Sequence, residues 1–199
     1  MEQIVSKKEL EELMKIKGEV RGFSLWEDGE FILRKEGENG VKKLENALAE
    51  TGHPLRFNEI KKMDFYPLWY QALILLLIHR IFNYGDKEFQ EMGAKEGKVS
   101  PLIRLFISYI FSPERSLKMA AKMWRNAFSV GDLKVAEFNK KDRYIVLRLE
   151  NWKLSPFNCQ VLKGYFSSLL KLMVKKDVTA EETKCVFKGD EHHEFILRW

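Results

Sequence analysis

The chain has 199 residues, of which 45% are hydrophobic and 32% are charged, and its net charge is +5. This composition is that of a folded globular protein and excludes an intrinsically disordered chain. The basic runs Lys61-Lys62, Lys140-Lys141 and Lys175-Lys176 are short and fall on different predicted elements, so we expect no nucleic-acid partner.

Two cysteines are too few for a disulfide framework and fit a reducing compartment or a metal site better. Residues 1–18 contain acidic side chains and no apolar core, unlike a secretory signal. The most apolar run, residues 72–82, is too short to span a bilayer and contains His79 and Arg80. We therefore expect a cytoplasmic protein without a membrane partner.

The first half of the chain is predicted to be mainly helical. Ser6 precedes apolar residues at helical spacing up to Ile16, and residues 19–26 read as a strand. Two alternatives stay open next, a hairpin turn at Asp28-Gly29 or a helix over residues 30–35. Further helices are expected over residues 40–52, 66–83 (with Pro67 in the first turn), 87–96 and 101–111.

The second half changes its pattern after one more helix, which Ser112 and Pro113 begin and which is expected to reach about Phe128. Residues 132–138 and 143–150 alternate apolar and polar side chains around a turn, which predicts a hairpin. Ser155-Pro156 begins an amphipathic helix, and residues 178–187 and 193–198 form a second hairpin. The resulting expectation is an α+β fold, with N-terminal helices packed on an antiparallel sheet and a C-terminal strand-strand-helix-strand-strand unit.

Three segments carry a resemblance to a known superfamily: SPERSLKMAAKMWRNAFSVGDLKV with its late Trp124, CQVLKGYFSSLLKLM with its internal Gly164, and EETKCVFKGDEHHEFILRW with a Gly-Asp turn. They resemble the 4-vinyl-reductase-like domains, which are related to haem NO-binding domains and to a trafficking-complex subunit family. The resemblance covers residues 100–199 well. It implies a single domain over residues 1–199 that binds a small apolar or aromatic molecule, acts in signalling and forms a homodimer.

Sensor members of this superfamily hold a structural zinc, and the resemblance implies Cys159, Glu182, Cys185 and His193 as its ligands. His193 stands where those sensors have a cysteine, and imidazole is an equally good zinc ligand. Side chains alternate along a strand, so a three-residue turn favours His193 and a four-residue turn favours His192. The alternative reading of both cysteines is ordinary burial as small apolar side chains.

Aromatic and methionine side chains over residues 102–128 are typical of an apolar ligand pocket, although their helical spacing also fits a solid core. The candidate lining residues are Phe106, Tyr109, Ile110, Met119, Met123, Trp124 and Phe128. Haem is not expected: the haem-binding relatives carry a proximal histidine on this helix and a Tyr-x-Ser-x-Arg motif, and residues 112–131 contain neither. His79, on an apolar helix, is interpreted as an ordinary helix-end histidine.

The sequence contains no nucleophile elbow, phosphate-binding glycine loop or dinucleotide fingerprint. We therefore expect a non-enzymatic sensory or regulatory domain that binds a small apolar or aromatic molecule, with zinc as its candidate cofactor. Two alternatives stay open. One is a protein–protein assembly module like the trafficking subunits, and the other is a reductase acting on a vinyl tetrapyrrole, which rests on the superfamily name alone.

Overall fold

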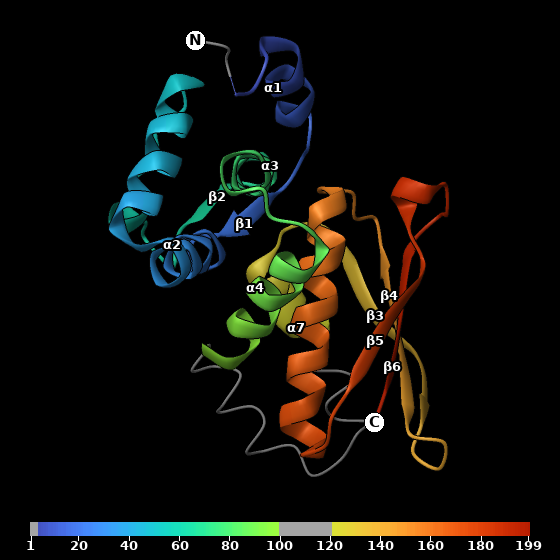
Figure 1. Ribbon diagram of the computed structural model, residues 1–199. Helices are drawn as coiled ribbons and strands as arrows, with labels where there is room; N and C mark the ends of the chain where they lie inside the picture. The colour runs from blue at the N-terminus through green and yellow to red at the C-terminus, as the bar shows by residue number, and fades with distance from the viewer. Residues whose placement is uncertain (1–3, 100–120) are drawn as a thin grey trace. The chain divides into compact units, whose positions relative to one another are not determined.

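The computed structural model describes residues 4–99 and 121–199 of the chain. Its residues fall into two compact units (Figure 1). The N-terminal unit comprises Met1–Gly85 with Ala127–Ser129, and the C-terminal unit comprises Asp86–Asn126 with Val130–Trp199. Each unit is described by itself below, and the single domain expected over residues 1–199 stays a prediction.

The N-terminal unit contains three helices and a short strand pair among its described residues. The helices are α1 (Lys7–Met14), α2 (Gly22–Glu50) and α3 (Trp69–Phe82), with a 3-10 turn η1 (Phe57–Glu59). Strands β1 (Glu19–Arg21) and β2 (Phe65–Pro67) pair in antiparallel fashion. Helix α3 supplies the centre of the core, because seven of its residues are buried (Gln71, Ala72, Leu73, Ile74, Leu75, Leu77 and Ile78).

The strand predicted over residues 19–26 is wrong beyond Arg21, because α2 begins at Gly22. The helix alternative for the next stretch is the one present, and no hairpin forms at Asp28-Gly29. Leu25, Gly29 and Ile32 are buried at helical spacing, and a Cβ on Gly29 would lie 2.4 Å from the Phe57 ring. Because glycine has no Cβ, the Phe57 ring can pack this close to α2 at Gly29.

The C-terminal unit is built on a four-stranded antiparallel sheet of order β3-β4-β6-β5. Its strands are β3 (Asp132–Asn139), β4 (Tyr144–Glu150), β5 (Thr179–Lys184) and β6 (His193–Arg198), and its described helices include α4 (Asp86–Val99) and α7 (Pro156–Val174). Helix α7 lies along one face of the sheet, and α4 packs on α7 (Figure 1). The predicted α+β class and strand-strand-helix-strand-strand order are confirmed.

Helices α4 and α7 cross at two facing glycines. A Cβ on Gly93 would lie 1.8 Å from the Val161 carbonyl oxygen, and a Cβ on Gly164 would lie 1.9 Å from the Gln90 carbonyl oxygen. The two backbones can approach this closely only because neither position has a side chain. Gly164, the internal glycine of the resembling helix segment, is buried against another helix.

No helix among the described residues combines the length and the apolar character needed to cross a bilayer. The stretch 121–127 is helical, as predicted. The predicted helix over residues 101–111 lies outside the described residues.

Candidate metal centre

The first turn of α7 positions Cys159. Ser155 caps this helix by accepting a hydrogen bond from the Phe157 amide at 3.3 Å, and Pro156 occupies the first helical position. Cys159 lies one turn later, where its thiol points at the Ser155 carbonyl oxygen at 3.9 Å. Ser155 and Pro156 set where the helix begins and thereby place Cys159 near its start.

The other candidate ligands come from the β5–β6 hairpin. Glu182 lies in β5, Cys185 directly follows it, and His193 is the first residue of β6. The loop is closed by the Asp190 side chain, which accepts a hydrogen bond from the Cys185 amide at 2.8 Å, and by the Asp190 amide, which donates to the Cys185 carbonyl at 3.2 Å. Gly189 allows this turn because its φ is +99°.

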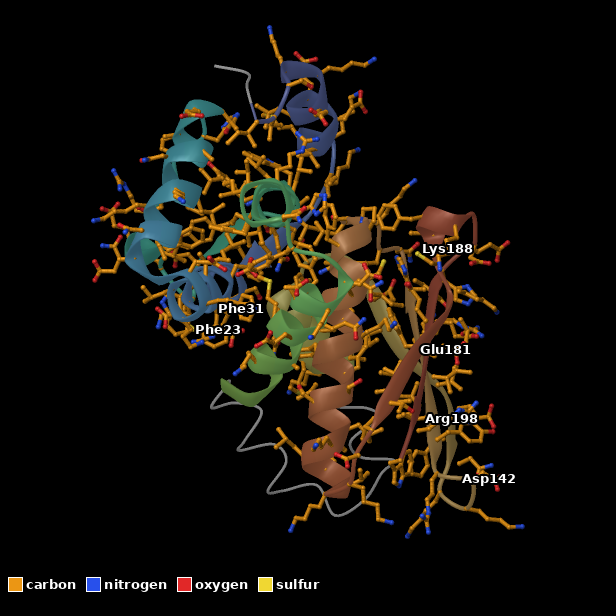
Figure 2. All side chains as sticks on the ribbon, in the orientation of Figure 1. Phe23, Phe31, Asp142, Glu181, Lys188 and Arg198 are labelled. Atoms are coloured by element: carbon orange, nitrogen blue, oxygen red, sulfur yellow. The ribbon has the colours of Figure 1, made fainter. Side chains whose placement is uncertain are left out.

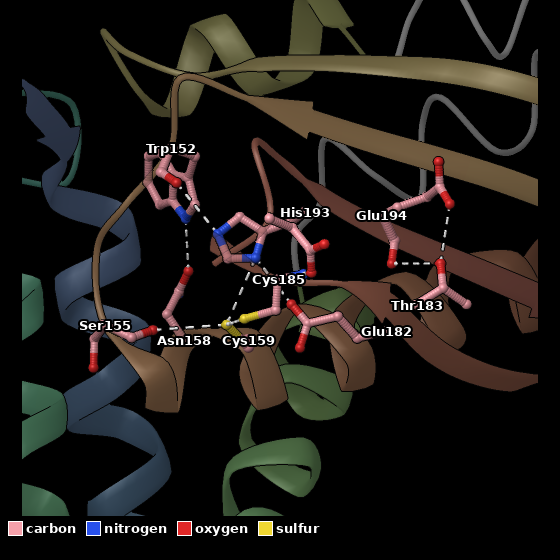
Figure 3. A network of polar contacts seen from close by, with 10 residues as sticks. Trp152, Ser155, Asn158, Cys159, Glu182, Thr183, Cys185, His193 and Glu194 are labelled. Carbon is pink, nitrogen blue, oxygen red and sulfur yellow. Dashed lines mark hydrogen bonds and ion pairs between the residues drawn. The ribbon is translucent and has the colours of Figure 1, made fainter. Parts of the chain in front are cut away.

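These four side chains meet at one point beside the α7 N-terminus (Figure 3). The Cys159 sulfur lies 3.8 Å from the Cys185 sulfur and 3.8 Å from His193 Nδ1. His193 Nδ1 lies 2.9 Å from Glu182 Oε1. The structure thus brings together the residues that the sequence singled out, with all four donor atoms within 4.8 Å of one another.

His192 lies outside this cluster. It is half-buried, and its Nε2 is 3.8 Å from Glu194 Oε2. Strand β5 ends at Lys184, and eight residues with a 3-10 turn, η2 (Val186–Lys188), separate it from β6. Neither of the short turns considered from the sequence forms, so strand alternation alone was unable to choose between the two histidines.

The cluster is buried, with Cys159 4%, Cys185 3% and His193 1% exposed. Burial raises the pKa of the Cys159 thiol far above its usual range, and the neighbouring Glu182 and Cys185 raise it further. Without a cation the thiolate form is therefore strongly disfavoured. Such a group of donors favours a positive ion, which would stabilise the deprotonated sulfur and the buried carboxylate together.

A second set of contacts orients the His193 ring. Its Nε2 lies 3.2 Å from the Trp152 carbonyl oxygen, which can accept a hydrogen bond from this nitrogen. Its Nδ1 faces Glu182 and Cys159 and is the nitrogen that would bind an ion. Trp152 is itself held by its indole N–H, which donates to Asn158 Oδ1 at 2.9 Å. The role of Trp152 and Asn158 around His193 was not predicted from the sequence. The only local indication of it is that both residues lie close to the Ser155-Pro156 cap.

The spacing of the two sulfurs suits a shared ion. Two thiolates bound at ~2.3 Å to a tetrahedral zinc lie about 3.8 Å apart, whereas a disulfide requires about 2.05 Å. The observed separation is 3.8 Å, and both cysteines are free. Two sulfurs, one imidazole nitrogen and one carboxylate oxygen are donors that zinc accepts, and four protein ligands leave no open position for a substrate.

The candidate ligand pocket is described only in part. Phe106, Tyr109, Ile110 and Met119 lie outside the described residues. Met123 is half-buried, and Trp124 is buried in the C-terminal unit, where its indole N–H donates to the Val130 carbonyl at 3.0 Å and its ring packs edge-on against Trp152. Phe128 belongs to the N-terminal unit, where it forms an isolated bridge with Val20. The pocket stays a prediction.

No protein-family model matches the chain, and no curated protein is significantly similar to it in sequence. Solved structures are similar in fold. An H-NOX protein from S. oneidensis in the Fe(II)NO ligation state has a TM-score of 0.65 at 13% identity, covering 89% of this chain and 98% of that one. A Fe(II) unliganded H-NOX protein from K. algicida has a TM-score of 0.64 at 10% identity, covering 89% and 95%.

The expectation against haem is corrected by these similarities. A third similar structure comes from work on "Modulating Heme Redox Potential Through Protein-Induced Porphyrin Distortion", with a TM-score of 0.59 at 12% identity, covering 90% of this chain and 99% of that one. The expectation against haem relied on the absence of a histidine and a motif from residues 112–131. A short motif does not determine the fold of the whole chain. The absence of that histidine and that motif therefore does not exclude haem. The chain has the fold of the H-NOX proteins.

Proposed function

We propose that this protein is a small-molecule-binding sensory domain whose C-terminal unit is stabilised by a structural zinc ion. The observation that carries the metal part is the buried convergence of Cys159, Glu182, Cys185 and His193, with all donor atoms within 4.8 Å. Four protein ligands favour a structural over a catalytic ion, because a catalytic zinc keeps one position for water or substrate. The ion would join the start of α7 to the β5–β6 hairpin.

The sensory part of the proposal is supported by the fold. One similar H-NOX structure is in the Fe(II)NO ligation state and another is Fe(II) unliganded. For this chain we propose an apolar or aromatic ligand, with haem as the first candidate. Within the C-terminal unit the lining would include the half-buried Met123, whereas Trp124 is packed against Trp152. A homodimer remains part of the proposal on the sequence resemblance alone.

The same chemistry favours the cytoplasm. Two buried thiols 3.8 Å apart need only a small movement to form a disulfide, and a reducing compartment keeps them available to a metal. Zinc itself protects such thiols, because both sulfurs are then bound as thiolates.

The test is native mass spectrometry with elemental analysis of the purified full chain. We expect one zinc per chain in the wild type, none in His193→Ala, and an unchanged zinc content in His192→Ala, which is the matched control because His192 lies outside the cluster. A wild-type protein that neither retains zinc nor gains thermal stability when zinc is added would refute the metal site.

The ligand is tested separately by adding haem to the zinc-loaded protein and recording its absorption spectrum. A stoichiometric shift of the Soret band supports haem as the bound molecule. If no shift occurs, and extraction yields another apolar compound in the mass spectrum, the ligand class holds and haem is excluded. A protein that binds neither would refute the sensory proposal and leave the metal site intact.

A further inference from the structure

Three basic segments that are far apart in sequence meet at one end of the C-terminal sheet. Asn139 pairs with Tyr144 at the tip of the β3–β4 hairpin, Tyr144 pairs with Arg198 near the end of β6, and Arg198 pairs with Thr179 at the start of β5. Helix α7 ends at Val174 and reaches β5 through only four residues. The hairpin tip, the helix end and the last residues of β6 therefore share one end of the unit.

This surface, which we call the basic end, carries seven exposed cations: Lys140, Lys141, Arg143, Lys171, Lys175, Lys176 and Arg198. Only Asp142 and Asp177 provide carboxylates within the same segments, and Asp177 pairs with Lys171 at 2.6 Å. Glu137 and Glu181 lie two residues further along their strands. Figure 2 labels Asp142 and Arg198 at this end. The positive excess of the chain is thus concentrated rather than spread evenly.

An exposed apolar side chain lies in the same segment as three of these cations. Met173 is 40% exposed and is two residues from Lys171 and two from Lys175 near the end of α7. The aromatic rings nearby are half-buried and already contact other side chains: Phe138 stacks on Trp199 at 6.1 Å between ring centroids, and the Arg198 guanidinium lies 5.5 Å from the Tyr144 ring centroid.

These details distinguish between possible polyanionic partners. Single-stranded nucleic acids are bound by exposed aromatic rings on which bases stack, and the rings here are half-buried and already contact one another or Arg198. Protein interfaces are depleted in lysine, and five of the seven cations are lysines. An anionic lipid surface needs only clustered cations with an apolar side chain that enters the headgroup layer. We propose that the basic end binds anionic lipid headgroups, with Met173 entering the interface.

This binding needs no membrane-spanning segment, and that is why the sequence did not suggest it. The expectation of no membrane partner was based on apolar runs, and the basic runs seemed to belong to separate elements. Strand pairing brings them together. The proposal is independent of the zinc site and of the small-molecule ligand, since none of the four candidate metal ligands belongs to the basic end.

The test is flotation of the full purified chain with phosphatidylcholine vesicles, with and without phosphatidylserine. We expect binding to the phosphatidylserine vesicles at low salt, loss of binding at high salt, and at least tenfold weaker binding for K140E/K141E/K175E/K176E. Met173→Ser should weaken binding a few-fold without changing its salt dependence. The control is K42E/K43E, which reverses two exposed lysines of α2 in the other unit, and it is compared with K175E/K176E, which reverses the same number at the basic end.

Three results would overturn the proposal. The first is wild-type protein that does not float with phosphatidylserine vesicles at low salt. The second is equal binding to neutral vesicles, which would assign the affinity to apolar contact. The third is an equal loss of binding in K42E/K43E, which would indicate a general effect of net charge. Binding to a DNA duplex in place of vesicles, lost in the fourfold variant, would assign the surface to nucleic acid and also overturn it.

Discussion

The two units contain buried carboxylates in opposite situations. In the N-terminal unit Glu45 accepts a hydrogen bond from Arg56 at 2.9 Å and another from the Phe57 amide at 3.0 Å. In the C-terminal unit Glu182 faces the His193 ring and two thiols, which bind metals but carry no permanent charge. The Glu45 carboxylate is therefore balanced by groups of the chain itself. The Glu182 carboxylate instead faces side chains that would bind a cation together with it.

The largest expected effect separates the two units by their response to metal. Chelation, or Cys185→Ala, should destabilise the C-terminal unit by several kcal/mol, on the order of other structural zinc sites. Hydrogen exchange should show amides of β5 and β6 losing protection while those of α3 keep theirs. Glu45→Gln should lower stability by about 1–3 kcal/mol whether or not zinc is present. Equal loss of protection in both units on chelation would contradict this comparison.

Lowering the pH should also destabilise the C-terminal unit selectively, as chelation does. Burial raises the pKa of the Cys159 thiol, so the thiolate exists only while a cation offsets this cost. Protons therefore compete with zinc, and the metal should leave as the pH falls. The check is zinc release followed with a colorimetric chelator alongside hydrogen exchange at each pH. Zinc retained down to the pH of global unfolding would contradict the assignment of thiolate ligands.

The next effect, on the free energy of unfolding, depends on side-chain packing rather than on the metal. Trp124 is 5% exposed, and its ring meets Trp152 at 4.8 Å between centroids with an interplanar angle of 78°. Trp124→Ala should therefore cost about 3–5 kcal/mol in unfolding free energy, as truncation in a packed core does. Denaturant unfolding of the zinc-loaded protein measures it. A cost below about 1 kcal/mol would indicate that Trp124 lines a cavity instead.

Replacing glycine where α4 and α7 cross should have a smaller effect on stability, opposite in sign to the usual effect of replacing a helical glycine. Alanine in place of glycine inside a helix normally stabilises by about 1 kcal/mol. At Gly164 a Cβ would lie 1.9 Å from a backbone oxygen of α4, so Gly164→Ala should destabilise by about 1–3 kcal/mol instead. Ser167→Ala, half-buried on the same helix, is the control and should stay within about 0.5 kcal/mol of wild type. Stabilisation by Gly164→Ala would show that the helices do not cross this closely.

The C-terminal unit was predicted well because its signals are local. The Ser155-Pro156 cap and the alternation in β4 each act within a few residues, so the element order followed from the sequence. The residues around His193 were missed because Trp152 reaches it from 41 positions away through a backbone carbonyl. In the N-terminal unit, Gly22 at the start of α2 lies so close to Lys61 and Tyr66 that a Cβ would clash with both, and no local pattern reveals this approach.

The smallest expected effect concerns α1, which is fastened by charge at the surface of the N-terminal unit. Arg80 pairs with Glu9 at 2.5 Å, and this hydrogen bond is the main reason that the Glu9 pKa falls to about 2. A depressed pKa means that the carboxylate contributes its full stability above pH 4.5, the unperturbed value, and loses it as the pH falls through about 2. Both side chains are partly exposed, so the contribution should stay below about 1 kcal/mol.

Glu9→Gln removes the charge and retains an acceptor for the Ser6 cap, so it isolates the pairing with Arg80. We expect faster amide exchange in α1 at neutral pH, and a smaller further change on acidification than in wild type. The control is Glu12→Gln, whose partner Lys15 lies in the turn that ends the same helix, so the pair does not connect α1 to α3. If both variants loosen α1 equally, the helix is held by its own propensity and apolar contacts, and the Arg80 pair contributes nothing measurable.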